Sequence, residues 1–259
     1  MSGTASRSAD APDRISVVTG AAGGIGRATV NALLARGDRV IAFDVDPSPF
    51  VQSDHLTPLA GDATRAADVE TLLHTAVALG GLHVLINLVG SPCTGRFEAL
   101  TLDDWRTGFE LNLTSVWLVT RKLLPLLRAT AGDRVIVNLS STLARVSDPD
   151  TIAYGAFKAA LEHLSRTLAI DLAADHIRVV AVAPGPVSGT RSDQQWSEEQ
   201  FGRLNPLGRF ATPNEVASVI AFVSSTAASF VTGCVYAVDG GDSALGVGWG
   251  APRRLGPLS

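Results

Sequence analysis

The 259-residue sequence is poor in cysteine, tyrosine and histidine, and it has only a small excess of acidic side chains. Its two cysteines, Cys93 and Cys234, are far apart, and neither has a His or Cys neighbour at metal-ligand spacing. The sequence therefore predicts reduced thiols, no disulfide framework and no metal site. A formal charge of −4 leaves no basic surface of the kind that binds nucleic acid, so we expect no nucleic-acid partner.

Long hydrophobic runs are also missing, because charged residues or glycines interrupt every apolar stretch before it could span a bilayer. Residues 1–13 are small and polar and lack the apolar core of a signal peptide, so they are expected to be a flexible leader. These features predict a cytoplasmic protein without a membrane partner.

The sequence is rich in short β-branched runs that alternate with longer helical patterns. A hydrophobic share of 46% against a charged share of 18% favours a large buried core. The predicted strands are Ile15–Thr19, Val40–Phe43, Leu56–Ala60, Val84–Asn87, Val135–Leu139, Val179–Ala183 and Val235–Val238. The predicted helices are Ile25–Ala35, Asp68–Leu79, Leu102–Arg128 in two pieces, Tyr154–Ala174 and Pro213–Ser224.

This alternation predicts an α/β single-domain Rossmann fold, in which a doubly wound parallel sheet of about seven strands has helices on both faces. The dinucleotide-binding and catalytic domain is expected to cover residues 14–242, with a C-terminal tail at 243–259. In such sheets the ligand binds beyond the carboxyl ends of the strands. Functional residues are therefore expected directly after strands.

A glycine-rich segment, Thr19-Gly20-Ala21-Ala22-Gly23-Gly24-Ile25-Gly26, joins the first strand to the first helix. Glycines allow the backbone to approach a pyrophosphate, and the following helix offers free N–H groups and the positive end of its dipole. A plain structural turn is the alternative, but the position between strand and helix favours a dinucleotide site.

Asp44 ends the second strand, where a carboxylate can accept hydrogen bonds from the adenosine ribose and repel a 2′-phosphate. This charge favours NAD over NADP. The alternative is that Asp44 only begins the turn that contains Pro47.

Tyr154 and Lys158 are four residues apart, so they lie on one face of the predicted helix. The ordinary pKa of tyrosine, near 10, is too high for a proton carrier at neutral pH. A lysine ammonium and the positive ring of the oxidised cofactor are expected to lower that pKa. Ser141, which follows a strand, can donate a hydrogen bond to a carbonyl oxygen as negative charge develops there.

These motifs together resemble those of the short-chain dehydrogenase/reductase family. The resemblance extends from about Arg14 to Asp242 and rests on motifs in the family's order: Gly20 to Gly26, Asp62, Asn87-Leu88-Val89-Gly90, Asn112, Ser141, Tyr154-x-x-x-Lys158 and Pro184-Gly185. It implies a catalytic set of Asn112, Ser141, Tyr154 and Lys158. It implies that the cofactor is bound by Gly20, Gly24, Ile25, Gly26, Asp44, Asp62, Ala63, Asn87, Gly90, Tyr154, Lys158, Pro184, Gly185, Val187 and Thr190.

In relatives the tyrosine is the general acid or base, the lysine also holds the nicotinamide ribose, and the asparagine lies at a helix kink and holds a water. Ser140 is a rival to Ser141, but the resemblance favours the second serine of the pair. The sequence departs from the family pattern at Leu88, at Ala183 before Pro184, at Ala144 three residues after Ser141, and at Gly189, where a threonine is usual. At Leu88 little loss is expected, because relatives hold the adenosine there mostly through backbone atoms. The other three departures concern substrate specificity more than the chemistry.

We therefore expect an NAD-dependent oxidoreductase that acts on a small-molecule secondary alcohol or its ketone. One alternative is an NADPH-dependent 3-oxoacyl reductase, and a non-catalytic dinucleotide-binding sensor is another. Substrate-pocket residues are expected within 92–94, 142–150 and 187–196, and residues 188–209, which include Trp196, are expected to form a lid. The resemblance also implies a homotetramer built on the long helices.

Overall fold

The computed structural model describes residues 14–148, 150–189 and 205–244. Within these residues, seven strands form one parallel sheet in the order β3-β2-β1-β4-β5-β6-β7, which confirms the predicted fold class. The strands are β1 (Ile15–Thr19), β2 (Arg39–Asp44), β3 (Leu56–Ala60), β4 (Val84–Asn87), β5 (Arg134–Leu139), β6 (Ile177–Pro184) and β7 (Val235–Val238).

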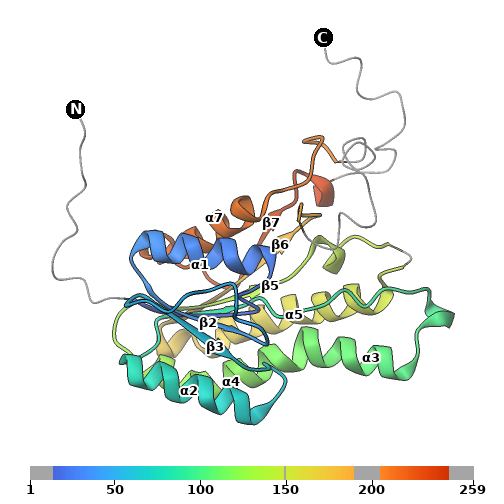
Figure 1. The fold of residues 1–259 in the computed structure, drawn as a ribbon. Coiled ribbons are helices and arrows are strands. Elements are labelled where there is room, and N and C mark those ends of the chain that lie inside the picture. Colours follow the sequence, from blue (N-terminus) through green and yellow to red (C-terminus); the bar gives the residue numbers. More distant parts are fainter. Residues whose placement is uncertain (1–13, 149, 190–204, 245–259) are drawn as a thin grey trace, which may run out of the picture.

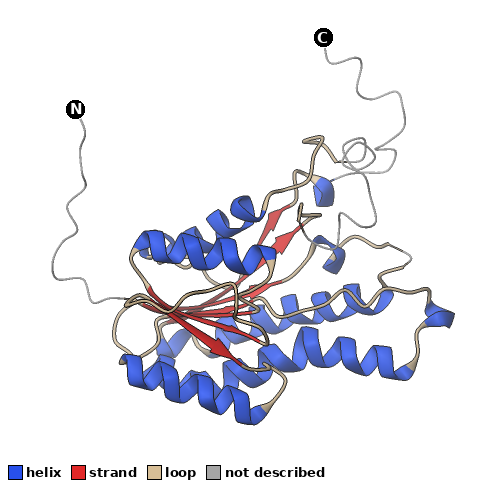
Figure 2. Cartoon of the chain, viewed as in Figure 1, coloured by secondary structure: helices blue, strands red, loops and turns tan. Residues whose placement is uncertain are grey.

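Helices cover both faces of this sheet, as Figure 1 shows. The helices are α1 (Gly24–Arg36), α2 (Ala66–Leu79), α3 (Leu102–Phe109), α4 (Ser115–Ala129), α5 (Ile152–Asp171) and α7 (Pro213–Val223). The pair α1 and α7 packs on one face, and α2, α4 and α5 lie on the other, so the fold has three layers with the sheet in the middle (Figure 2).

The buried strand residues divide between the two faces because successive side chains of a strand point in opposite directions. Val18 packs with Leu33 of α1 and Ile220 of α7, whereas its neighbour Val17 packs with Leu72 of α2. The strands are therefore hydrophobic on both sides, which explains why the sequence shows continuous apolar runs and no alternation.

Helix ends follow the expected chemistry. Gly37 ends α1 in the left-handed conformation, with φ of 98°. Thr101 and Asp104 form a capping box at the start of α3. A second capping box, formed by Thr212 and Glu215, begins α7.

The predicted helical stretch 102–128 is in two pieces, as expected. A π-helical turn, Glu110–Thr114, separates α3 from α4, and it is closed by a hydrogen bond from the Ser115 amide to the Glu110 carbonyl. Several boundaries differ from the prediction by one to three residues, and the larger differences include α2, which begins at Ala66, and α5, which runs from Ile152 to Asp171. A short 3-10 turn, Ala173–Asp175, takes up the end of the predicted fifth helix.

None of the helices in the described part of the chain is long and apolar enough to cross a membrane. The predicted leader, Thr190, Trp196 and the tail beyond residue 244 lie outside the described residues.

Candidate active site

The glycine-rich turn between β1 and α1 has two positions that exclude a side chain. A Cβ on Gly26 would lie 2.3 Å from the Gly20 carbonyl oxygen, and one on Gly20, whose φ is +68°, would lie 2.9 Å from the Val89 amide nitrogen. Gly23 is the N-cap of α1, and the first turn of the helix holds no acidic side chain. The free backbone N–H groups at the start of α1 suit a phosphate.

Asp44, at the end of β2, lies directly against this turn. Its Oδ2 accepts a hydrogen bond from the Ala22 amide at 2.9 Å, and its Oδ1 accepts one from the Asp46 amide at 3.2 Å. The carboxylate therefore stands beside the glycine turn and also begins a local turn, so the two roles considered from sequence are compatible.

Two further predicted cofactor residues follow β3. Asp62 accepts hydrogen bonds at Oδ1 from the Thr64 amide at 2.8 Å and from its hydroxyl at 2.7 Å. Ala63 is buried, and Ile25 at the start of α1 is partly buried against the core. These residues lie after the strands and at the start of α1, as expected of a dinucleotide site.

Asn87 and Gly90, from one motif, lie in different surroundings. The Asn87 side chain is inside the sheet, where its amide donates to Asn138 Oδ1 at 2.9 Å and to Thr120 Oγ1 at 3.3 Å. Gly90 lies at the catalytic cluster, where a Cβ would be 2.7 Å from Asn112 Oδ1 and 3.1 Å from Lys158 Nζ. Gly90 is therefore what allows the chain after β4 to pass beside these two side chains.

Asn112 is fully buried in the π-helical turn. Its Nδ2 donates to the carbonyl oxygens of Ser91 and Gly108, both at 2.9 Å. Its Oδ1 has no hydrogen-bond partner among the described residues. A buried acceptor without a partner is costly, so this oxygen suits a bound water or ligand group.

Tyr154 and Lys158 lie one turn apart near the start of α5. The Lys158 ammonium is 5.5 Å from the centre of the Tyr154 ring and donates to the Leu139 carbonyl at 2.8 Å. Lys158 is only 2% exposed. The end of β5 thus holds the lysine next to the tyrosine.

Burial dominates the acid–base properties of this pair. It raises the pKa of Tyr154 to about 12, against a smaller lowering from a hydrogen bond with Ser141, and it lowers the pKa of Lys158 to about 8. The pKa of Tyr154 is therefore raised in the chain alone, and the lowering expected from Lys158 and the positive ring of the oxidised cofactor stays a prediction. Removing the phenolate from water costs more than the neighbouring groups of this chain recover, so Tyr154 is a phenol at neutral pH.

The two adjacent serines after β5 have different partners. Ser141 lies near enough to Tyr154 to lower the pKa of the tyrosine slightly, and it caps the 3-10 turn Thr142–Ala144 by accepting from the Leu143 amide at 3.2 Å. The Ser140 hydroxyl donates to Glu162 Oε1 at 3.1 Å and lies 3.4 Å from the Lys158 carbonyl. Of the two hydroxyls, only that of Ser141 meets the tyrosine.

The segment after β6 is held by main-chain contacts. The Gly185 amide donates to Val238 at the end of β7, and a Cβ on Gly185 would lie 3.1 Å from the Asp239 backbone. Val187 is buried and pairs with Ala211 in an isolated bridge. Pro184 ends β6, so this segment stands beyond the strand, where the nicotinamide end of a dinucleotide would lie by family resemblance.

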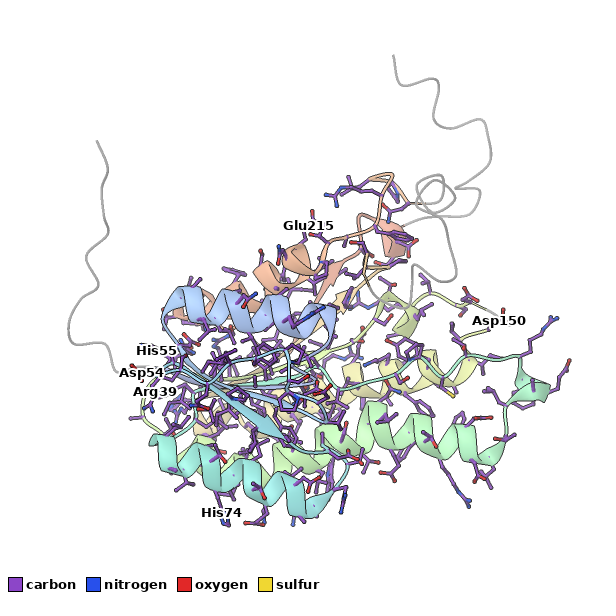
Figure 3. The ribbon with its side chains drawn as sticks, viewed as in Figure 1. Arg39, Asp54, His55, His74, Asp150 and Glu215 are labelled. Carbon is purple, nitrogen blue, oxygen red and sulfur yellow. The ribbon has the colours of Figure 1, made fainter. Side chains whose placement is uncertain are left out.

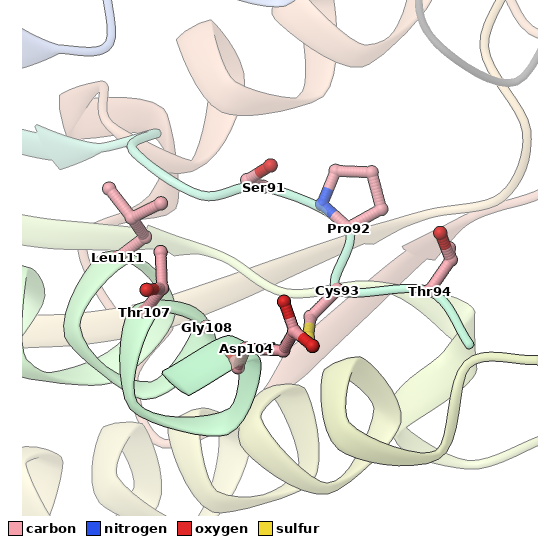
Figure 4. A pocket seen from close by; sticks show the side chains of 8 residues that line it. All are labelled: Ser91, Pro92, Cys93, Thr94, Asp104, Thr107, Gly108 and Leu111. Carbon is pink, nitrogen blue, oxygen red and sulfur yellow. Dashed lines mark hydrogen bonds between the residues drawn. The ribbon is translucent and has the colours of Figure 1, made fainter. Parts of the chain in front are cut away.

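A pocket of about 260 Å³ lies next to Asn112, between the chain after β4 and α3. Figure 4 shows residues 91–94 passing over α3, with Asp104 and Gly108 of that helix beneath them. Ser91 and Gly108, whose carbonyls accept from Asn112, both line the pocket. Its lining residues are Ser91, Pro92, Cys93, Thr94, Asp104, Thr107, Gly108 and Leu111.

The histidines give no competing catalytic group. His83 is buried, and its Nδ1 accepts from the Ile15 amide at 3.1 Å. Figure 3 shows His55 and His74 far from Asp150, which belongs to the segment between Ser141 and α5. Among the described residues, no group of three metal-ligating side chains is close enough to hold an ion. Both cysteines are free thiols, as predicted.

The residues present fit a nicotinamide dinucleotide. Gly20 and Gly26 allow the tight turn whose backbone leads into α1, and Asp44 supplies an acceptor beside it. Gly90 allows the chain to pass beside Asn112 and Lys158. The orphaned Asn112 oxygen lies at the other end, next to Lys158. One end of this arrangement suits phosphates and a ribose, and the other end holds a proton-transfer group.

Comparisons with known proteins agree with this geometry. Residues 20–243 match a family model described as enoyl-(acyl carrier protein) reductase. The cis-4-hydroxycyclohexanecarboxylate dehydrogenase of Sinomonas cyclohexanicum is 38% identical over 247 residues, which cover 90% of this chain and 98% of the relative. The 2-(S)-hydroxypropyl-CoM dehydrogenase 3 of Xanthobacter autotrophicus is 33% identical, with coverages of 90% and 98%.

Among solved structures, a 3-ketoacyl-(acyl-carrier-protein) reductase from Brucella melitensis, complexed with NADH, has a TM-score of 0.83 and 29% identity. The match covers 89% of this chain and 98% of that chain. The chain belongs to the short-chain dehydrogenase/reductase family. It is thus an oxidoreductase that acts on CH–OH groups, in a family that binds a nicotinamide dinucleotide.

Two residues of the site were missed by sequence reasoning. Glu162 is 3% exposed and contacts Ser140, and Gly155 lies so close to the Ser141 segment that a Cβ would be 2.8 Å from the Leu143 carbonyl oxygen. The spacing of Glu162, four residues after Lys158, was the available signal for its position on the same helix face. Nothing in the sequence marked Gly155.

Proposed function

We propose that this protein is an NAD-dependent dehydrogenase or reductase that interconverts a small secondary alcohol and its ketone. The observation that carries the proposal is the contact between the Ser141 and Tyr154 hydroxyls beside a buried lysine. The catalytic set is Asn112, Ser141, Tyr154 and Lys158. The dinucleotide is held by Gly20, Gly24, Ile25, Gly26, Asp44, Asp62, Ala63, Asn87, Gly90, Pro184, Gly185, Val187 and Thr190 together with Tyr154 and Lys158.

The bound dinucleotide would supply the hydride acceptor or donor. In reduction, Tyr154 gives its proton to the carbonyl oxygen while the Ser141 hydroxyl donates a hydrogen bond to the same atom. A raised tyrosine pKa suits this direction, because the phenol keeps its proton until the oxygen becomes basic. In oxidation, Tyr154 must first lose that proton, so positive charge beside the ring is needed to favour the phenolate.

The preference for NAD rests on Asp44. Its carboxylate lies against the Ala22 amide in the glycine turn, where a 2′-phosphate would meet a like charge. The Brucella melitensis reductase was solved in complex with NADH, which supports the same cofactor.

A second candidate is a 3-oxoacyl reductase that uses NADPH. It is favoured by the same neighbour, a 3-ketoacyl-(acyl-carrier-protein) reductase, and it is opposed by the Asp44 charge. A non-catalytic sensor is a third candidate, but such a protein has no use for Ser141, Tyr154 and Lys158 in one cluster.

One screen tests these functions. Cyclic and aliphatic secondary alcohols, hydroxy acids and 3-oxoacyl thioesters would be assayed with NAD(H) and NADP(H), with NAD(P)H absorbance as the readout. We expect turnover of an alcohol or ketone with NAD(H). Preference for 3-oxoacyl thioesters with NADPH would favour the second candidate. Dinucleotide binding without turnover of any class would favour the sensor.

We further propose that the protein is a homotetramer. Large aromatic side chains are exposed on the long helices: Trp105 at 43%, Phe109 at 41% and Trp117 at 51%. Exposed aromatic residues in one region are typical of a protein–protein interface. Light scattering coupled to gel filtration tests this, and a monomer at micromolar concentration would contradict it.

A further inference from the structure

Helix α5 holds a third polar residue in line with the catalytic pair. Tyr154, Lys158 and Glu162 follow one another at intervals of four, and Glu162 is only 3% exposed. Burying a carboxylate is costly unless it is paired and hydrogen-bonded. Glu162 therefore needs partners in the surrounding elements, and these partners come from the segment that holds Ser141.

The two carboxylate oxygens hold opposite ends of that segment. Oε1 accepts from the Ser140 hydroxyl at 3.1 Å, and Oε2 accepts from Arg145 Nε at 3.2 Å. Ser140 directly precedes Ser141, and Arg145 follows the turn Thr142–Ala144. Arg166, one turn further along α5, adds a second positive charge, with its Nη1 3.8 Å from Oε2.

The segment between these two contacts packs closely on the reactive end of α5. The Leu143 carbonyl oxygen lies where a Cβ on Gly155, the residue after Tyr154, would come within 2.8 Å. At its start, the Ser140 amide is fixed to the sheet by a 2.7 Å hydrogen bond to Val182. The contact of Arg145 with Glu162 therefore holds the turn Thr142–Ala144 against α5, and this keeps Ser141 close to Tyr154.

We propose that Glu162 is a positioning residue: it acts through Ser140 and Arg145 to keep the Ser141 hydroxyl within reach of the Tyr154 hydroxyl and the substrate oxygen. This inference rests on the proposed function, because it assigns a role within the same reaction. Glu162 itself touches neither substrate nor cofactor. Its effect is on orientation, and small errors of orientation are expensive in catalysis.

The test compares Glu162→Gln with the wild type, using the substrate that the screen identifies. The amide still accepts from Ser140, but it loses the charge that holds Arg145. We expect kcat to fall about 10- to 100-fold, with the NADH dissociation constant changed less than about threefold. Arg145→Met should lower kcat in the same direction, and Arg145→Lys, which keeps the charge, should restore part of it.

Asp133→Asn is the matched control. Asp133 is also a carboxylate bound by two arginines, Arg14 at 3.2 Å and Arg178 at 3.0 Å, but it precedes β5 at the opposite end of the sheet. This variant should lower the melting temperature and leave kcat near the wild-type value. If Glu162→Gln likewise lowers the melting temperature and leaves kcat near the wild-type value, Glu162 only stabilises the fold.

A double-mutant cycle separates positioning from stability. If Glu162 acts through Ser141, the loss of kcat caused by Ser141→Ala should be at least about threefold smaller in the Glu162→Gln background. Equal losses in the two backgrounds would overturn the inference. If Glu162→Gln does not fold, the same cycle with Arg145→Met decides the question, because Arg145 is partly exposed.

Failure of the proposed function would look different. A Tyr154→Phe variant with near wild-type turnover would remove the proposed mechanism whatever Glu162 does. An inactive Tyr154→Phe variant together with a fully active Glu162→Gln variant would overturn only the positioning role.

Discussion

Gly90 and Asn112 are in such close contact that a Cβ on Gly90 would lie 2.7 Å from Asn112 Oδ1. The same Cβ would lie 3.1 Å from Lys158 Nζ. The backbone after β4 thus limits where both polar groups can be, and the loop and the catalytic helix fix each other's positions.

Gly90→Ala is therefore expected to lower kcat at least about tenfold, because the added methyl displaces Asn112 or Lys158 from the cluster. Asn112→Ser makes room for that methyl, but the loss of the Asn112 amide lowers kcat by itself. The double variant should consequently lose less than the product of the two single losses. Kinetics of all four proteins measure this, and purely multiplicative losses would contradict the contact.

Tyr154→Phe should reduce kcat about 10²- to 10⁴-fold and leave NADH binding largely intact, because the phenol is the proton carrier. Tyr236→Phe is the matched control, since these are the two tyrosines of the chain. Steady-state kinetics and NADH fluorescence titration give the two readouts. Near wild-type turnover by Tyr154→Phe would rule out its role.

Ser141→Ala should lower kcat more than Ser140→Ala. The Ser141 hydroxyl meets Tyr154, whereas that of Ser140 is bonded to Glu162. Both variants remove one hydroxyl, so each is the control for the other in the same assay. The reverse order would show that the catalytic serine is Ser140.

Cofactor choice is expected to follow the charge of Asp44. Two like charges at about 4 Å repel by about 4 kcal/mol at an effective dielectric constant near 20, and salt and solvent reduce this. If about a quarter remains, NAD is preferred about fivefold. Asp44→Asn keeps an acceptor for the Ala22 amide and removes the charge, so it should shift kcat/KM toward NADP, and an added Val45→Arg should shift it further.

The control for this shift is Asp46→Ala, which removes an exposed carboxylate two residues away. Its ratio of kcat/KM for the two cofactors should match that of the wild type at fixed ionic strength. A wild type that prefers NADP, or an Asp44→Asn variant with an unchanged ratio, would leave Asp44 as a turn residue only.

Lys158 should make the protein less stable at neutral than at alkaline pH. Burial lowers its pKa from 10.5 to about 8, so the unfolded chain binds this proton more tightly than the folded chain. The penalty is absent above pH 10.5, grows as the pH falls, and below about 8 reaches about 3 kcal/mol as an upper value. Lys158→Met should therefore be inactive but more stable than the wild type at pH 7.

That advantage should shrink as the pH rises from 8 toward 10. Urea unfolding of both proteins without cofactor, at each pH, measures the difference, and other titrating groups cancel in the comparison. A difference that does not change with pH would mean that Lys158 is not a buried ammonium in the folded protein.

Much of the fold could be predicted because the strands are buried on both faces. Continuous apolar runs such as Ile15–Thr19 and Val84–Asn87 stand out between polar turns, and their predicted bounds match the structure. The first residues of the helices were harder to predict from the sequence. Arg65, the N-cap of α2, has no side-chain cap, and no residue type there signalled that the helix begins at Ala66.

Within the site, residue spacing along one helix was sufficient to predict that Tyr154 and Lys158 lie together. Contacts between distant segments could not be predicted in this way. The pairing of Ser140 with Glu162 spans 22 positions and depends on how the loop folds back. The effect of burial on the tyrosine pKa could not be predicted for a related reason, since burial is a property of the packed structure and not of the local sequence. The interior position of Asn87 likewise follows from its bond to Asn138 on the neighbouring strand.

The π-helical turn at Asn112 contains one residue more than an α-helical turn, and the orientation of every later residue in α4 depends on it. Because an α-helix advances about 100° per residue, winding these same residues, 110–114, as a regular α-helix would rotate α4 by about that angle. Val116, Val119 and Leu123, now buried, would then turn from the sheet toward solvent. Deletion of one residue from 110–114 should therefore leave α4 packed on the sheet while it removes the turn that holds Asn112, so this change of length would harm the chemistry before it harmed the fold.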